Sequence, residues 1–203
     1  ISIRDAVSPA QEDGSVKGLV EFEHVSFQYP GAEEKVLDDI SFTARKGQTV
    51  AFIGSTGSGK STLVNLIPRL FDVTEGKVKA DGIDVRDMKL KDLRDRLGYV
   101  PQKGVLFSGT IDSNIRYGYE EATEDEVKKA AQIAQAWDFI SEKEEGLASP
   151  IAQGGSNVSG GQKQRLSIAR AIAKKPEIYI FDDSFSALDF ATDARLRKAI
   201  KEN

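Results

Sequence analysis

The chain has 203 residues, 39% of them hydrophobic and 30% charged, which is enough to bury a full core, so we expect one globular domain with a subdomain. It lacks cysteine and has one histidine, which excludes disulfides and Ser/His triads, and its net charge of −4 argues against a nucleic-acid partner. No apolar run approaches the roughly 20 residues of a membrane-spanning helix and no signal-peptide pattern opens the chain, so we expect it to be soluble by itself.

The first segment, residues 1–17, has scattered Ser, Asp, Glu, Pro and Gly without a period, which is typical of a linker from an upstream domain. Folding is expected to begin at residue 18. A first strand ends at Tyr29-Pro30-Gly31, and a second spans Val36 to Ala44. His24 lies in the first strand, and because no second ligand or nucleophile accompanies it, we interpret it as a strand residue without chemistry.

Thr49 to Thr62 predicts a phosphate-binding loop. A short apolar run of strand type leads into glycines that fit the pattern G-x-x-x-x-G-K-[ST], and a helix is expected from Ser61 to Ile67. The alternative is a glycine-rich surface turn, but the flanking strand and helix favour a cradle in which main-chain N–H groups bind a polyphosphate. Lys60 would reach the terminal phosphates and Ser61 would bind Mg²⁺. The residues expected to form the cradle are Gly54, Ser55, Thr56, Gly57, Ser58, Gly59, Lys60, Ser61 and Thr62.

The middle of the chain predicts short strands followed by helices. Two turn signals bracket a strand from Lys77 to Ala80, and the charged stretch from Asp84 to Arg96 has apolar residues at helical spacing. A helix from Thr123 to Gln135 starts with a capping box formed by Thr123 and Glu126. Residues from about 87 to 154 are therefore expected to form a mainly helical subdomain inserted into an α/β core.

Two aspartates close an apolar run near the end of the chain. Ile178 to Phe181 predicts a buried parallel strand, which Asp182 and Asp183 follow directly. Ligands collect at this edge of a parallel sheet, so Asp182 would hold Mg²⁺ and Asp183 could accept a proton from an attacking water. The alternative is a pair of solvated aspartates that cap the following helix. The last residues, Asp189 to Asn203, predict an amphipathic helix.

The segment Ser159, Gly160, Gly161 and Gln162 precedes a helix expected to run to about Lys174. Ser159 and Gln162 form a capping box, so one interpretation is simply a well-started helix. The other is that the N–H groups of Ser159 to Gly161 form a second anion site.

Taken together and in this order, these three segments resemble the motifs of the ABC ATPases, in which the Ser-Gly-Gly-Gln segment is the signature. The resemblance covers the chain from Leu19 onward. It implies that Tyr29 is the aromatic residue that stacks on adenine. It also implies that Gln102 is the Q-loop glutamine near Mg²⁺ and the attacking water, and that Ser186 to Asp189 is the D-loop that crosses between partners.

The segments Val105 to Ile111 and Asn114 to Gly118 resemble the exporter branch of that family. The resemblance therefore implies an ATP-hydrolysing motor at the cytoplasmic face of a membrane, with ATP and Mg²⁺ as cofactors. Its partners would be a second nucleotide-binding domain and the coupling helices of a membrane domain. The implied fold is α/β, a P-loop NTPase (RecA-like) core with a small antiparallel β-subdomain and an inserted helical subdomain over residues 18–203, with the C-terminal end missing.

Three departures from the family pattern raise alternative functions. Asp183 stands where the family has a catalytic glutamate, Gln153 replaces a glutamate shortly before the signature, and the switch histidine is absent before Asn203. An aspartate at this position resembles the degenerate site of heterodimeric exporters, so a nucleotide switch with little turnover is the second hypothesis. A soluble ABC protein of DNA repair or translation is the third, and the acidic charge and the segment from Phe107 to Gly118 argue against it.

Overall fold

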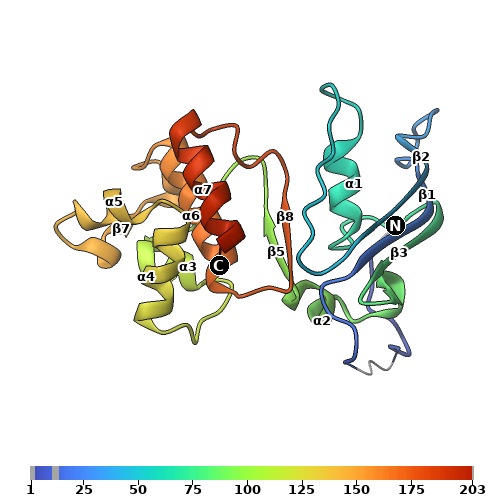
Figure 1. The fold of residues 1–203 in the computed structure, drawn as a ribbon, viewed down its shortest axis with the longest axis horizontal. Helices are drawn as coiled ribbons and strands as arrows, with labels where there is room; N and C mark the ends of the chain where they lie inside the picture. The colour runs from blue at the N-terminus through green and yellow to red at the C-terminus, as the bar shows by residue number, and fades with distance from the viewer. Residues whose placement is uncertain (1–2, 11–13, 203) are drawn as a thin grey trace. The chain divides into compact units, whose positions relative to one another are not determined.

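The computed structural model describes residues 3–10 and 14–202, and the chain divides into two compact units, residues 1–97 and 98–203 (Figure 1). The expected linker and the expected chain end lie partly outside the described residues, at positions 1, 2, 11–13 and 203. Over the described ranges, no helix has both the length and the apolar character needed to cross a bilayer.

The first unit contains an antiparallel sheet of four strands in the order β2-β1-β3-β4, which confirms the small antiparallel part of the predicted fold (Figure 1). Strand β1 lies inside the sheet, where its Phe22 pairs with Phe42 on one side and Val78 on the other. The ladder shifts register beside His24, which has φ of 49° and places Nδ1 2.7 Å from Asp39 Oδ1. The four strands are β1 (Val20–Phe27), β2 (Leu37–Ala44), β3 (Glu75–Ala80) and β4 (Ile83–Asp84).

Helix α1 (Lys60–Leu66) follows the glycine loop and buries Leu63, Val64 and Leu66. A 3₁₀ turn, η1 (Val85–Asp87), and helix α2 (Leu90–Asp95) complete the first unit. The apolar run before the glycine loop was expected to be a strand, but residues 49–54 form no ladder with the strands of this unit. Ile53 in this run is 96% exposed. A strand needs hydrogen bonds from a neighbour, and an apolar sequence alone does not supply them.

Part of the expected linker is held by hydrogen bonds to residues of the first unit. Residues 3–10 form neither helix nor strand, yet Asp5 Oδ1 accepts a hydrogen bond of 2.7 Å from Leu90 N at the start of α2. The carbonyl of Arg4 accepts one of 3.0 Å from Arg69 Nη1, which follows the C-terminal end of α1. These bonds give the segment a defined position although its sequence has no period.

The second unit is mainly helical, and a short pair of strands, β5 and β8, lies to one side of its helices (Figure 1). Strand β8, which was expected to be buried, is only partly buried: Ile180 is buried and Tyr179 is 38% exposed. In the described part of the chain, β8 pairs only with β5, which leaves its other edge uncovered by a strand. The elements are β5 (Leu97–Val100), β6 (Gly109–Thr110), α3 (Ile111–Arg116), α4 (Glu124–Ile133), α5 (Trp137–Ser141), η2 (Gly146–Ala148), β7 (Pro150–Ile151), η3 (Gln153–Gly155), α6 (Gly160–Ala173), β8 (Ile178–Phe181) and α7 (Phe190–Glu202).

Helix α6 is the core element of the second unit. It packs against α3 and α4, and its Leu166 and Ile168 are fully buried in the same apolar cluster as Ile115 of α3 (Figure 1). The predicted capping boxes at the starts of α4 and α6 are both confirmed. The packing fixes α6 in the unit, and the signature segment lies at its first turn.

Candidate functional site

The glycine loop before α1 has a main-chain conformation that other residues rarely adopt. Gly57 and Gly59 have φ of 83° and 89°, in the left-handed region. A Cβ atom at Gly59 would also lie 3.1 Å from the carbonyl oxygen of Val36, whereas one at Gly57 would meet nothing within 4 Å. Gly59 is therefore required both for its conformation and for the close approach of the main chain.

Lys60, the first residue of α1, extends its side chain back over the loop. Its Nζ donates to the carbonyl oxygens of Gly54 at 2.8 Å and Ser55 at 2.7 Å. Because Gly59 has no side chain, it cannot cap the N–H groups of the first turn of α1. An ammonium group and the start of a helix thus lie at one loop, which is an arrangement suited to an anion.

Tyr29 is half-buried and lies beside the same loop. Its hydroxyl is 2.9 Å from Thr62 Oγ1, in the first turn of α1. Its ring meets those of Phe27 and Phe71 edge to face, at centroid distances of 4.8 and 5.3 Å. The structure thus brings Tyr29 together with the phosphate-loop helix.

In the second unit, the ends of β5 and β8 lie side by side. Asp182 N donates to the carbonyl of Val100 at 3.0 Å, and Ser184 Oγ donates to the same oxygen at 2.7 Å. Burial, together with the negative charge of Asp182, raises the pKa of Tyr99 in β5. The pairing places the residues that follow each strand, Gln102 and Asp183, next to each other.

Gln102 and Asp183 make direct contact. Gln102 Nε2 donates to Asp183 Oδ2 at 3.1 Å, although 81 positions separate them in the sequence. Asp183 has φ of 47°, a left-handed conformation that aspartate tolerates better than most residues, and its carbonyl accepts a hydrogen bond from Ser186 Oγ. An amide donor therefore orients a carboxylate at the end of β8.

The signature segment begins α6 as a complete capping box. Ser159 Oγ accepts from Gln162 N at 3.2 Å, and Gln162 Oε1 accepts from Ser159 N at 3.0 Å. A Cβ atom at Gly161 would lie 3.4 Å from the carbonyl of Ala187, so this turn lies against the expected D-loop. At the end of that loop, Asp189 accepts a hydrogen bond from the main-chain N–H of Thr192 near the start of α7, and its hydrogen bonding lowers its pKa.

The sequence analysis did not identify two buried polar residues that contact the loop at Val100 and Pro101. Gln164 is 1% exposed and donates from Nε2 to the carbonyl of Pro101, and Ser184 is fully buried against Val100. A signal for Gln164 was present, because it shares a helix face with Ile168 and Ala171 at positions i, i+4 and i+7. A polar side chain on an apolar face predicts a hydrogen-bond partner without naming it.

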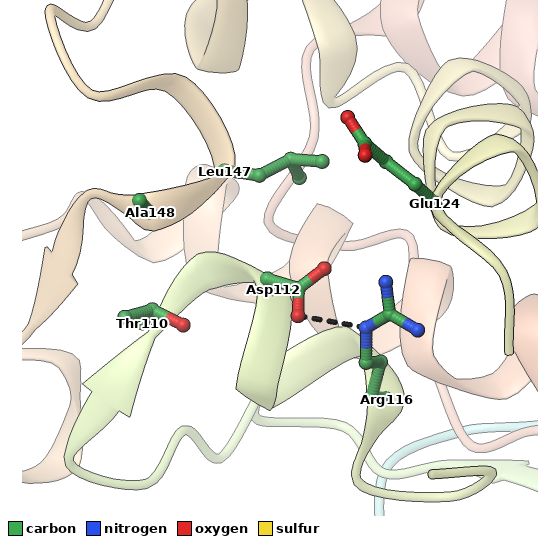
Figure 2. Close-up of a pocket in the computed structure, with 6 residues that line it drawn as sticks. All are labelled: Thr110, Asp112, Arg116, Glu124, Leu147 and Ala148. Carbon is green, nitrogen blue, oxygen red and sulfur yellow. Dashed lines mark hydrogen bonds and ion pairs between the residues drawn. The ribbon is translucent and has the colours of Figure 1, made fainter. Parts of the chain in front are cut away.

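A further hollow of about 360 Å³ lies in the helical part of the second unit (Figure 2). Asp112 and Arg116 of α3 form an ion pair of 2.7 Å, and Figure 2 shows this pair with Glu124 of α4 and Leu147 nearby. None of the residues predicted to bind nucleotide or magnesium lines this hollow. The predicted magnesium ligands belong to different units, Ser61 to the first and Gln102 and Asp182 to the second.

The glycine loop and the fold around it define a P-loop nucleotide-binding protein. The chain belongs to the ABC transporter family, whose model matches residues 37–186. It is 50% identical over 198 residues to an uncharacterised ABC transporter ATP-binding protein of Mycobacterium bovis, covering 96% of this chain and 34% of that protein. It is 44% identical over 202 residues to the ATP-dependent lipid A-core flippase of Methylobacillus flagellatus, covering 99% of this chain and 35% of the flippase.

Among solved structures, a bacterial Atm1-family ABC exporter with ATP bound matches this fold with a TM-score of 0.91 and 37% sequence identity. The match covers 100% of this chain and 35% of the exporter chain. The fold is therefore the nucleotide-binding domain fold of ABC transporters, as predicted. The chain spans about a third of the length of each protein it matches.

Proposed function

We propose that this chain is the ATP-binding and ATP-hydrolysing motor domain of an ABC exporter. It would work at the cytoplasmic face of a membrane, driven by head-to-tail pairing with a second such domain. The exporter and flippase named among the proteins it matches support this proposal, and so does their greater length, which leaves room for a membrane domain.

The observation that carries the proposal is the loop from Gly54 to Thr62. Its two left-handed glycines, Gly57 and Gly59, shape the turn. Lys60 Nζ donates to two carbonyl oxygens of the loop at 2.8 Å or less. When ATP is bound, the same ammonium group would neutralise the terminal phosphates. Ser61, Gln102 and Asp182 all offer oxygen ligands, and Mg²⁺ prefers one or two carboxylates combined with phosphate oxygens and water. The chemistry of these donors is therefore compatible with Mg-ATP, and Tyr29 would stack on the adenine.

In hydrolysis, Asp183 would accept a proton from the attacking water and Gln102 would orient that water and the carboxylate. The contact of 3.1 Å between them is of the length that such positioning requires. Magnesium would supply positive charge that offsets the charge of the phosphates. Lys60 would offset the negative charge of the terminal phosphates.

A complete site would need a second copy or a homologous partner. Each nucleotide would lie between Lys60 of one domain and Ser159 to Gly161 of the other, at the start of α6. Closure of the pair would move the coupling helices of the membrane domain, and hydrolysis with phosphate release would reopen the pair.

The second candidate function is a degenerate half of a heterodimeric exporter, which binds ATP and closes with little turnover. The observation that favours it is Asp183 itself, which is one methylene shorter than the glutamate of the family pattern. The complete reading frame and its neighbour would separate the two functions, because a heterodimer partner would carry glutamate at this position. Membrane spans upstream would support transport in either case, and a soluble upstream domain would contradict it.

The binding of ATP is tested with Lys60→Ala and a fluorescent ATP analogue. We expect affinity to fall by about 10- to 100-fold, because a hydrogen bond to a charged group contributes roughly 1.5–3 kcal/mol. Lys46→Ala, which removes an exposed lysine in a turn before the loop, is the matched control and should bind normally. Unchanged affinity in the Lys60 variant would overturn the assignment of the phosphate loop.

Pairing is tested by sedimentation of the isolated domain with and without Mg-ATP. We expect a monomer that associates weakly when ATP is present, because the signature of a second copy completes each site. A tight dimer that forms without nucleotide would contradict this mechanism.

A further inference from the structure

We propose that Phe71 is a positioning residue for the adenine end of the nucleotide site, because it fixes the ring of Tyr29 together with Phe27 and Thr62. These three residues are called the tyrosine clamp below. The inference rests on the proposed function, in which Tyr29 stacks on the adenine. It adds that the affinity for the base depends on Phe71, which would act on ATP only through Tyr29.

The ring of Tyr29 has two aromatic neighbours. Its centroid lies 4.8 Å from that of Phe27 and 5.3 Å from that of Phe71, with interplanar angles of 84° and 87°. Phe27 and Phe71 also contact each other, at a centroid distance of 5.6 Å, so the three rings form a closed group. Perpendicular pairs are a favoured geometry of aromatic side chains. Neither phenylalanine is stacked in parallel on Tyr29, which is the arrangement that a nucleic-acid base takes on an aromatic side chain.

The hydroxyl group of Tyr29 makes the third contact of the clamp. It lies 2.9 Å from Oγ1 of Thr62, which is 7% exposed and belongs to the first turn of α1. Threonine is β-branched, so in a helix its side chain has few rotamers and its oxygen has few positions. One hydrogen bond at the end of the tyrosine and two ring contacts thus restrict both of its side-chain torsions.

Phe71 is itself held by the turn that follows α1. Arg69, which is 7% exposed, donates from Nε and Nη2 to the two carboxylate oxygens of Asp72 at 2.7 and 3.3 Å. Phe71 directly precedes Asp72. The paired hydrogen bonds of a guanidinium and a carboxylate have a fixed geometry, so they fix the main chain that carries the phenylalanine.

The segment that carries Phe71 is also bonded to the end of β1, just before Tyr29. Thr74 N donates to the carbonyl of Ser26 at 3.0 Å, and Thr74 Oγ1 accepts from Gln28 N at 2.9 Å. On the other side of the tyrosine, the carbonyl of Tyr29 accepts from Ala32 N at 3.0 Å. The two main-chain segments that meet at the clamp are therefore fixed relative to each other.

Such a clamp would raise the affinity for ATP by fixing Tyr29 before the nucleotide arrives. A mobile side chain loses conformational freedom when a ligand immobilises it, whereas a side chain that is already fixed does not. The phosphates would be held by Lys60 and by the main chain of the glycine loop, and Phe71 would make no contact with them. Loss of the Phe71 ring should therefore weaken binding of the base and leave binding of the phosphates unchanged.

The test compares Mg-ATP with magnesium tripolyphosphate, which keeps the phosphate chain and lacks the base. Dissociation constants are measured on the complete transporter by displacement of a ribose-labelled fluorescent ATP analogue. We expect Phe71→Leu, which keeps an apolar side chain and removes the ring, to weaken ATP binding about three- to tenfold. Binding of tripolyphosphate should change less than about twofold, because Lys60 and the loop are intact.

A double-mutant cycle shows whether Phe71 acts through Tyr29. In the Tyr29→Ala background, Phe71→Leu should change ATP binding less than about twofold, because two residues that act as one unit are not additive. Tyr29→Phe removes only the hydroxyl group that reaches Thr62, and it should weaken ATP binding about threefold. Tyr29→Phe takes the place of Phe71→Leu if that variant does not fold.

Two variants serve as controls. Phe71→Tyr keeps the ring and should bind ATP like the wild type. Phe22→Leu removes a different aromatic pair of the same sheet, Phe22 with Phe42 at a centroid distance of 4.5 Å. It should lower stability and leave the binding of both ligands unchanged.

Three results would overturn the inference: unchanged ATP binding in the clamp variant, equal losses for ATP and tripolyphosphate, or losses that multiply in the double variant. Equal losses would mean that Phe71 supports the glycine loop in general rather than the base. A wild type that binds neither ATP nor tripolyphosphate would instead overturn the proposed function.

Discussion

The residues that we propose to bind nucleotide fall into two halves, one in each unit, and the two halves are built differently. In the first unit, the loop before α1 is shaped by the main chain, with left-handed glycines and carbonyls that accept from Lys60. In the second unit, the contacts around Gln102 and Asp183 are made by side chains that stand far apart in the sequence. The first half should therefore be sensitive to any added Cβ atom, and the second to the length and donors of particular side chains.

The largest expected effect is at the main-chain half, in Gly59→Ala compared with Gly57→Ala. Both variants place alanine in a left-handed conformation, which costs about 1–2 kcal/mol or roughly tenfold in ATP affinity. Only Gly59→Ala also crowds the carbonyl of Val36, so we expect its loss to reach about 100-fold. Titration with a fluorescent nucleotide measures the ATP affinity of both variants. Equal losses would mean that the left-handed conformation alone, and not the contact with Val36, accounts for the loss of affinity.

The next effect is at the side-chain half, in Asp183→Glu. Aspartate should leave its carboxylate on the order of 1 Å from the place where glutamate orients the water, and such misplacement can cost about 10²-fold. We therefore expect turnover at this site to rise at least about tenfold, or roughly 1.4 kcal/mol of barrier, with ATP affinity within a few-fold. The measurement is site-resolved turnover in the full-length pair with the partner site disabled.

Asp183→Asn is the matched control, because it keeps the length of aspartate and removes the base. It should lower any turnover that aspartate supports. If Asp183→Glu brings no increase, aspartate is already an adequate base or other departures silence the site, and the degenerate-site hypothesis would be withdrawn.

A smaller effect separates the two interpretations of the signature. Ser159→Ala and Thr123→Ala each remove the N-cap of one capping box, at α6 and α4, so each should lower the free energy of unfolding by about 1 kcal/mol in urea titrations. If Ser159 also binds a phosphate of the second copy, only Ser159→Ala should weaken association induced by Mg-ATP. Equal association in the two variants would leave Ser159 as a helix cap.

The smallest effect concerns acid stability of the first unit. Burial raises the pKa of Asp84, but hydrogen bonds from the side chain and main chain of Arg86 outweigh it, so the pKa in the folded protein is below its ordinary value. A lowered pKa gives stability that is present above the unfolded pKa of about 4 and lost as pH falls through the folded pKa. Asp84→Asn should therefore flatten the decline of stability below about pH 4, as unfolding curves at several pH values would measure. If the free energy of unfolding of Asp84→Asn falls with pH as steeply as that of the wild type, the Asp84–Arg86 pair is not a source of acid sensitivity.

The sequence by itself determined the features that depend on neighbours within a few positions. The glycine loop before α1, the capping boxes at Thr123 and Ser159 and the positions of the longest helices and strands follow from turn chemistry and from periods of two or 3.6 residues. The resemblance built on those motifs identified the family correctly.

Only the tertiary structure decided which distant groups meet. It placed Gln164 on Pro101, fastened Arg4 and Asp5 to the first unit and left residues 49–54 without a ladder in that unit. A sequence pattern indicates that a buried polar group or a strand needs a partner, because an unpaired donor or acceptor costs free energy. The identity of that partner depends on how segments separated by tens of residues pack, and no local period encodes it.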